Sequence, residues 1–259
     1  MVHIRSDDTV ASALAMPDAG VPDAVNAAQH GVAVKTIRRW RRLYQRRGPP
    51  RGQPHTSVHC PRCDDASLDE AAYAELLGWY LGDGWIESSA NGVKTLHVYN
   101  DAKYVGLNDH IVDLQRRVKP GGRPHRRWKD GVCIISSGWK HWLCLFPQHG
   151  AGRKHERVLP MAAWQREVVE RHPADFLRGL LHSDGARVAN WATRIVDGEK
   201  RRYDYPRWQF VNHSEQTLGW CCDALDLAGV PWRRSGRWTV SVSTRAGVAR
   251  LDELVGPKR

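Results

Sequence analysis

The chain has 259 residues, of which 41% are hydrophobic, and a formal net charge of +11 at pH 7. This size and apolar content allow one large domain or two modest ones, and the lack of an apolar run of about 18 residues excludes a membrane-spanning helix. The first residues carry acids and no apolar run, so we expect no secretory signal and reduced cysteines in a cytoplasmic protein. The positive charge favours a polyanionic partner, most simply nucleic acid.

Residues 1–48 predict a small all-α domain rich in arginine. Residues 22–29 have the pattern of a short helix with a proline near its start, residues 30–32 form a glycine turn, and residues 33–47 repeat apolar side chains at a period near 3.6. This order resembles the helix-turn-helix of bacterial DNA-binding regulators and recombinases. The side chains expected to face a DNA groove are Lys35, Thr36, Arg38, Arg39 and Arg42. The alternative is an arginine-rich helix pair that binds phosphates without reading sequence.

Residues 49–67 follow as a linker rich in proline and glycine. The linker contains Cys60 and Cys63 in a Cys-x-x-Cys pattern, which is half of a zinc knuckle. A complete Zn²⁺ site needs two more ligands. The candidates are His55 and His59 just upstream, because the sequence has no second Cys-x-x-Cys. The alternative is a turn that binds no metal.

One pattern occurs twice in the rest of the chain, at residues 76–84 and 177–185. Each copy is an apolar run with small residues four positions apart, followed by Asp-Gly. Small residues at this spacing lie on one helix face and let two backbones approach closely. The repeat therefore predicts two packed helices that end at Asp83 and Asp184, each followed by a glycine in the left-handed conformation.

The two carboxylates are poorly placed at bare helix ends. The helix dipole is negative at the C-terminus, and Asp83 and Asp184 would also repel each other there. A divalent cation would relieve this repulsion, and hard cations such as Mg²⁺ prefer oxygen ligands. The alternative for one copy alone is a buried helix that ends at an Asp-Gly turn and has no chemistry.

The repeat resembles the motif of the LAGLIDADG homing endonuclease family. The last three residues of that motif correspond to residues 82–84 and 183–185. Strand-like and helix-like segments follow each copy in the same order, and residues 150–172 form a basic connector. The predicted fold class is therefore α+β. Residues 68–150 form one αββαββα half, and residues 151–259 contain the connector and a second half related to it by pseudo-twofold symmetry. The resemblance implies a monomer whose strands lie in the major groove of double-stranded DNA.

The resemblance also implies the chemistry of phosphodiester hydrolysis. Asp83 and Asp184 would hold Mg²⁺ or another divalent cation, one acting on each strand, with the backbone carbonyls of Gly82 and Ser183 as further ligands. The family places basic residues near its site, and the matching positions are Lys154 and Arg157, with Lys140 and Lys258 as weaker candidates. The strand residues expected to contact bases or phosphates are Arg126, Arg127, Arg187, Arg194, Arg207, Gln209, Arg233 and Arg237.

The expected function is that of a site-specific DNA endonuclease making a metal-dependent double-strand break in a long, asymmetric site. The alternative is a DNA-binding transcriptional regulator on an inactive scaffold of the same family, and an RNA-splicing maturase would use the same basic surface. The two acids favour the endonuclease, because carboxylates repel phosphate unless a cation intervenes. We expect a free-standing enzyme of a mobile element, located with the nucleoid of a bacterium or with a phage.

Overall fold

The chain divides into two units, Met1–Val58 and His59–Arg259. The computed structural model describes residues 7–16, 20–47, 59–89 and 92–258. None of the described helices is long and apolar enough to cross a membrane.

The first unit is helical in its described part, with α1 (Asp7–Ala15), α2 (Asp23–Gln29) and α3 (Val34–Arg47). The predicted helix, turn and basic helix are confirmed as α2 and α3, whereas α1 was not predicted. A small core joins the three helices through the buried side chains of Ala13, Ala27 and Ile37. Asn26 of α2 also donates a hydrogen bond of 2.7 Å to the carbonyl of Ala13. The additional helix α1 therefore gives α2 and α3 an apolar surface to pack against.

The second unit contains two halves with the same order of elements. The first half consists of α4 (Glu70–Asp83), β1 (Gly84–Ser88), β2 (Lys94–Asp101), α5 (Val105–Val118), β3 (His125–Lys129), β4 (Val132–Gly138) and α6 (Trp142–Leu145). The second half consists of α8 (Pro173–Ser183), β5 (Gly185–Val196), β6 (Glu199–Val211), α9 (Glu215–Leu227), β7 (Arg233–Gly236), β8 (Thr239–Val242) and α10 (Arg245–Val255). Between them lie a 3₁₀ turn (Lys154–Glu156) and α7 (Ala163–Arg171). Each half has the predicted αββαββα order.

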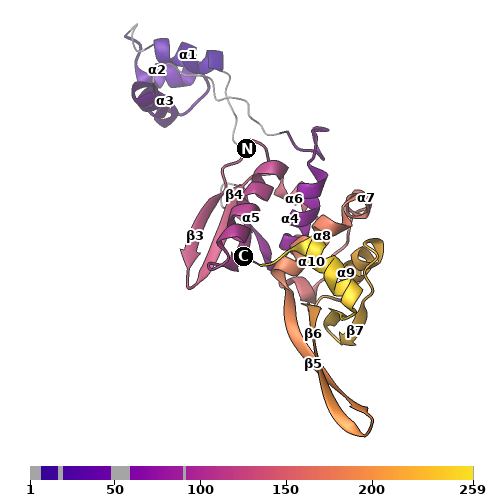
Figure 1. Ribbon diagram of the computed structural model, residues 1–259. Coiled ribbons are helices and arrows are strands. Elements are labelled where there is room, and N and C mark those ends of the chain that lie inside the picture. The colour runs from indigo at the N-terminus through magenta and orange to yellow at the C-terminus, as the bar shows by residue number, and fades with distance from the viewer. Residues whose placement is uncertain (1–6, 17–19, 48–58, 90–91, 259) are drawn as a thin grey trace. The chain divides into compact units, whose positions relative to one another are not determined.

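Each half folds its four strands into one antiparallel sheet. The strand order is β1-β2-β4-β3 in the first sheet and β5-β6-β8-β7 in the second. The two sheets therefore have the same topology, and the unit has the α+β class that the sequence predicts (Figure 1).

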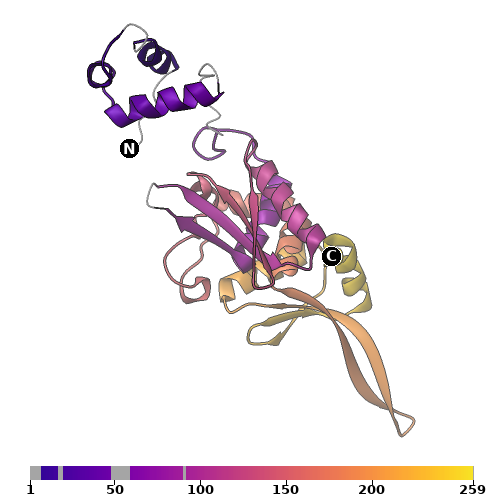
Figure 2. The same ribbon diagram turned by 90° about the vertical axis from the view of Figure 1, so that its left-hand side faces the viewer.

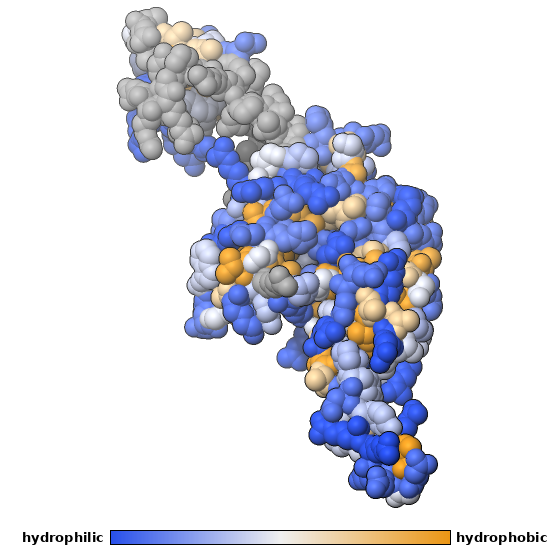
Figure 3. All heavy atoms as spheres, viewed as in Figure 1, coloured by the Kyte–Doolittle hydropathy of each residue, from blue (hydrophilic) through white to orange (hydrophobic). Residues whose placement is uncertain are grey.

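The two sheets differ in the length of their first hairpin. β1 and β2 have 5 and 8 residues, whereas β5 and β6 have 12 and 13. The longer hairpin extends away from the body of the unit in two perpendicular views (Figures 1 and 2). Its visible surface is mostly hydrophilic (Figure 3). The halves therefore share a topology while presenting strand surfaces of different lengths.

Helices α4 and α8 pack against each other at their glycines. A Cβ atom on Gly179 would lie 2.1 Å from the carbonyl oxygen of Glu75, and one on Gly78 would lie 2.6 Å from that of Phe176. The two backbones are thus in direct contact, as the repeat predicts. The buried apolar side chains of the two helices include Tyr73, Leu76, Leu77, Trp79, Leu177, Leu180 and Leu181.

The glycines that follow the two acids do not adopt the predicted left-handed conformation. Gly84 begins β1 with φ −95° and ψ 152°, and Gly185 begins β5 outside the group of glycines with positive φ. A Cβ atom on Gly84 would lie 2.4 Å from the Cα of Tyr80, and one on Gly185 would lie 2.5 Å from the carbonyl oxygen of Leu181. These glycines are therefore required by the close approach of the chain as it turns from helix into strand.

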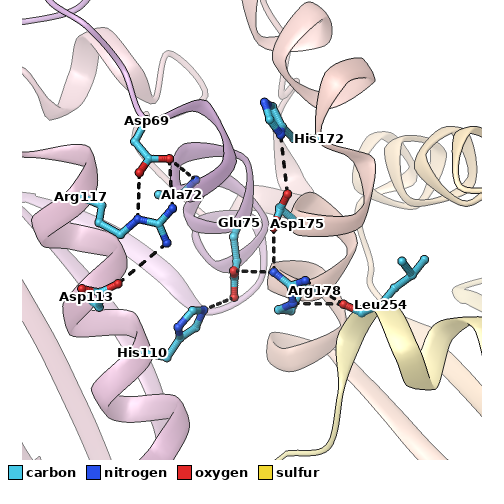
Figure 4. Close-up of polar contacts among 10 residues, drawn as sticks. All are labelled: Asp69, Ala72, Glu75, His110, Asp113, Arg117, His172, Asp175, Arg178 and Leu254. Carbon is cyan, nitrogen blue, oxygen red and sulfur yellow. Dashed lines mark hydrogen bonds and ion pairs between the residues drawn. The ribbon is translucent and has the colours of Figure 1, made fainter.

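A buried ion-pair network crosses the contact between α4 and α8 (Figure 4). Glu75 is 2% exposed, and its carboxylate pairs with Arg178 at 3.2 Å and with His110 at 2.8 Å. Arg178 also pairs with Asp175 at 2.8 Å and donates to the carbonyl of Leu254 at 3.1 and 3.0 Å. The network therefore connects α4, α5, α8 and α10. Removing Arg178 or His110 would leave the buried charge of Glu75 with only one of its two partners and would therefore destabilise the fold.

The Gly179→Ala substitution should destabilise the protein, because the new methyl group would overlap the carbonyl of Glu75 and separate the helices. Overpacking of this kind costs about 1–3 kcal/mol or more. Gly219→Ala in α9 is the matched control, since a Cβ atom there would meet nothing within 4 Å, and it should stabilise the helix by about 0.5–1 kcal/mol. Urea unfolding measures both effects. Equal effects of the two substitutions would contradict the backbone contact.

The stability of the protein should also depend on the protonation of His110, whose hydrogen bond with Glu75 raises the pKa of His110 above 6.5. A raised pKa in the folded state gives stability that is fully present below the unfolded pKa and lost as the pH rises through the folded pKa. The advantage of the wild type over His110→Gln in free energy of unfolding should therefore shrink as the pH rises from about 6 to about 8. Urea unfolding at several pH values tests this, and an advantage that grows with pH would refute it.

Candidate active site

Asp83 and Asp184 lie at the ends of the two packed helices. Asp83 is the last residue of α4, and Asp184 is the C-cap of α8. Gly82 leaves room for the end of α8, since a Cβ atom on Gly82 would lie 2.2 Å from Oγ of Ser183 and 3.2 Å from Cγ of Asp184. The packed glycines therefore bring the two carboxylates into one site.

The site disfavours the charge of both carboxylates. Burial raises the pKa of Asp83 to about 6, the negative charge of Asp184 adds to the effect, and Lys154 and Lys258 oppose it. Burial also raises the pKa of Asp184, while Asn212 lowers it by donating a hydrogen bond of 2.6 Å to its Oδ2. Two half-buried acids with raised pKa values are groups whose ionised forms a divalent cation would stabilise.

One lysine covers the end of each helix. The ammonium of Lys154 donates to four carbonyls at the end of α4. These are the carbonyls of Tyr80 at 2.6 Å, Leu81 at 2.9 Å, Gly82 at 2.6 Å and Gly84 at 3.0 Å. Lys258 donates in the same way to the carbonyls of Ser183 and Gly185, at 3.3 and 2.7 Å. Cations are favourable at helix C-termini. The two lysines therefore occupy equivalent positions at the ends of α4 and α8. The sequence analysis named Lys258 only as a weaker candidate.

Arg157, which was predicted beside Lys154, is directed elsewhere. Its guanidinium donates to the carbonyl of Gln148 and lies near Tyr80, whose pKa burial raises to about 12. The second basic residue at the carboxylates is instead Lys258. Its place near the chain end could not be inferred from local sequence, because only the fold brings it to α8.

The oxygen atoms of the site fit a hard divalent cation. The carboxylates of Asp83 and Asp184 are the kind of ligand that Mg²⁺ prefers. The carbonyls of Gly82 and Ser183, the other predicted ligands, each accept a hydrogen bond from one of the two lysines. A carbonyl oxygen has two lone pairs, so this bond leaves each oxygen able to accept one further partner.

Asn212 belongs to the site and was not predicted. It directly follows β6, and the strand register makes Asn100 of β2 its counterpart in the first half. Asn100 donates to Asn108 at 2.9 Å, so the two halves use this position differently. The sequence signal that would have found Asn212 is a second repeat, in which two apolar or aromatic residues precede asparagine at the end of the second strand.

An open cavity of about 770 Å³ adjoins the carboxylate of Asp184. Its wall includes Lys154, Asp184 and Asn212 from the site, together with Trp85 and Tyr99 from the first sheet. Trp85 and Tyr99 are each 38% exposed. The cavity therefore connects the site with the solvent-exposed face of a sheet.

The strand register sorts the predicted DNA-contacting residues between two faces. Residues that pair across antiparallel strands point to the same face. Arg207 pairs with Val188 and Gln209 with Ala186, one position away from the buried Trp208. The face of each sheet opposite these buried side chains is its open face. The predicted residues on the open faces of the two sheets are Arg127, Arg194, Arg207, Gln209 and Arg233. Arg237 lies in the turn before β8, where it stacks 4.5 Å over the ring of Trp238.

Two of the predicted DNA-contacting arginines lie on the helix-covered faces instead. Arg187 donates to Asp252 of α10 at 2.7 and 2.9 Å, and Arg126 forms an ion pair with Asp109 of α5. These ion pairs attach the sheets to the helices and hold both arginines away from the uncovered strand faces, whereas the sequence analysis expected both to contact DNA. Sequence alternation fixes which residues share a face, but it does not reveal which face the helices cover.

The basic helix α3 of the first unit presents polar side chains to solvent. Arg38 donates to Asp23 of α2 at 3.2 Å. Of the residues predicted to face DNA, Thr36 is partly buried, and the exposed ones are Lys35, Arg38, Arg39 and Arg42. A recognition helix requires this exposure, and its contact with DNA stays a prediction.

The Cys-x-x-Cys pair has partners other than the predicted ones. Its thiols lie with His141 and Cys144 in a group whose potential ligand atoms are all within 4.8 Å of one another. His59 is exposed and lies outside this group, and His55 lies outside the described residues. The sequence analysis considered only nearby ligands, whereas the fold brings in a His-x-x-Cys pattern from α6.

No protein-family model and no curated protein matches the sequence. The crystal structure of I-DmoI in complex with DNA and Mn is 13% identical, with 73% of this chain and 98% of that chain covered at a TM-score of 0.47. The LAGLIDADG meganuclease I-AabMI bound to uncleaved DNA is 12% identical, with 70% and 82% covered at a TM-score of 0.44. The meganuclease I-SmaMI bound to uncleaveable DNA is 9% identical, with 71% and 84% covered at 0.44.

Asn212→Ala should raise the pKa of Asp184, because the carboxylate would lose the hydrogen bond that stabilises its charged form. Carbon-detected NMR titration of the aspartate carboxyl groups in the metal-free protein measures this pKa. Asn100→Ala is the control, since Asn100 donates to Asn108 and should not affect Asp184. An unchanged or lowered pKa of Asp184 in Asn212→Ala would contradict the geometry of the site.

Proposed function

We propose that this chain is a DNA endonuclease that cleaves both strands with the help of a divalent cation. The observation that carries the proposal is the pairing of Asp83 and Asp184 at two helix ends held together by backbone contact. Burial opposes the charge of both carboxylates, and carboxylates repel phosphate. A divalent cation would stabilise the buried carboxylate charges and would also attract a phosphate, so the site is suited to a phosphodiester group.

In this proposal, each residue of the site has a defined task. A divalent cation held by Asp83 and Asp184 would neutralise charge at the scissile phosphate and activate a water. Lys154 and Lys258 hold the carbonyls at the two helix ends and keep positive charge beside the carboxylates. Burial lowers the pKa of Lys154 to about 8, so its ammonium is still mostly protonated at pH 7. Asn212 fixes the orientation of the Asp184 carboxylate.

The open faces of the two sheets are the proposed DNA-binding surface. They carry the arginine and glutamine side chains that read bases or hold phosphates. Since β5 and β6 are longer than β1 and β2, the second half would contact a longer stretch of DNA than the first. One chain supplies both carboxylates, so we propose a monomer acting on a long asymmetric site. The helices of the first unit would add a separate DNA contact.

One observation favours a second function, that of a DNA-binding regulator without catalysis. The ammonium groups of Lys154 and Lys258 already act on the carboxylates and oppose the rise in the pKa of Asp83. Two lysines can therefore offset part of the repulsion between the acids and DNA phosphates without a metal. The two functions differ in whether bound DNA is cut when Mg²⁺ is supplied.

Cleavage should require both carboxylates. We expect the purified protein with Mg²⁺ to linearise a plasmid that carries DNA surrounding its own gene. Asp83→Asn and Asp184→Asn should each reduce double-strand cleavage by roughly 10³-fold or more, since the cation contributes several kcal/mol. Binding of the plasmid fragment in a gel-shift assay should persist in both variants.

The control is Asp223→Asn, which changes an exposed aspartate of α9 and should alter neither cleavage nor binding. Specific binding without cleavage under Mg²⁺, Mn²⁺ or Ca²⁺ would refute the endonuclease and leave the regulator. Cleavage that survives both substitutions would show that the reaction takes place elsewhere.

A further inference from the structure

Four potential soft-metal ligands meet at the start of the second unit, away from the carboxylates. Cys60, Cys63, His141 and Cys144 each offer one ligand atom, and these atoms are all within 4.8 Å of one another. The Sγ atoms of Cys63 and Cys144 are 3.5 Å apart, and Sγ of Cys144 is 3.6 Å from Nδ1 of His141. Three sulfur atoms and one imidazole nitrogen are the ligand set of a Cys₃His zinc site.

Two short turns hold these ligands in place. In the first turn, the N–H of Cys63 donates to the carbonyl of Cys60 at 3.2 Å, and the N–H of Arg62 points at Sγ of Cys60 at 3.4 Å. In the second turn, the N–H of Cys144 donates to the carbonyl of His141 at 2.9 Å. Each turn therefore presents two ligands three residues apart, in the Cys-x₂-Cys and His-x₂-Cys patterns that suit a tetrahedral ion.

Without a cation, this cluster has little to hold it together. Thiols are weak hydrogen-bond donors, so their mutual contacts stabilise the cluster only slightly.

We propose that Cys60, Cys63, His141 and Cys144 bind one structural Zn²⁺ ion. Each thiol releases its proton to solvent as its sulfur bonds to the metal, and the imidazole binds through a nitrogen lone pair. Four protein ligands leave no open position for a substrate, which makes the ion structural. A disulfide between Cys63 and Cys144 is the competing arrangement, and it would leave the other two ligands without a role.

The ion would fix the segment before α4 to α6, at the opposite end of α4 from Asp83. Tyr73 in the first turn of α4 donates to the carbonyl of Leu145 in α6 at 2.5 Å, so α6 already contacts that end of the helix. α4 has 14 residues, which places its two ends about 20 Å apart. The zinc site is therefore independent of the carboxylate site, and its test does not depend on the proposed cleavage.

The full-length protein, purified from medium containing zinc, should hold about one equivalent of Zn²⁺ by elemental analysis. Reconstitution of the metal-free protein with Co²⁺ should give the visible absorption of tetrahedral cobalt bound to thiolates. Cys63→Ala and Cys144→Ala should weaken this absorption and lower the thermal unfolding temperature. Cys222→Ala is the control, because this buried cysteine of α9 lies outside the cluster.

His141→Ala should shift the cobalt bands while keeping the thiolate-to-metal transition, because only the nitrogen ligand changes. Less than about half an equivalent of zinc in the wild type, together with no cobalt spectrum, would overturn the proposal. A Cys63–Cys144 disulfide found by mass spectrometry in protein purified without oxidant would overturn it as well.

Discussion

The backbone contact between α4 and α8 is the constraint on which the rest of the second unit depends. Gly78 and Gly179 have no side chains, so the helices meet at distances that any Cβ atom would prevent. This contact sets the axis between the two halves and brings both carboxylates to one place. The Glu75 network then connects the packed pair with α5 and α10. The site is thus a consequence of helix packing, since neither half contains it alone.

The electrostatics of the site follow from the same packing. The negative charges of two acids are unfavourable at the negative ends of two helices, and one lysine at each end reduces this cost. Lys154 lies in the connector and Lys258 follows α10, so each helix end is covered by a lysine that is distant in the sequence. The lysines reduce the rise in the pKa of Asp83 but do not abolish it. The remaining imbalance is the physical reason for proposing a divalent cation.

The sequence predicted those features that depend on short-range pattern. The two repeat copies gave both helices and both acids, and periodicity with turn residues gave the αββαββα order. It did not reveal which strand face the helices cover, so it could not show that Arg126 and Arg187 lie on the covered faces and pair with helix aspartates. It also missed the partners of the Cys-x-x-Cys pair and the site role of Asn212, because those depend on contacts between distant segments. The conformation of Gly84 was predicted from a helix-ending rule, whereas the crowding against Tyr80 decides it.

The most direct test of the account is to locate a divalent cation. Crystals of the protein soaked in Mn²⁺ and measured at the manganese absorption edge would show each bound ion as an anomalous peak. The account predicts a peak in contact with the carboxylates of both Asp83 and Asp184. A crystal soaked to saturation with Mn²⁺ that shows no anomalous peak between these two carboxylates would contradict it.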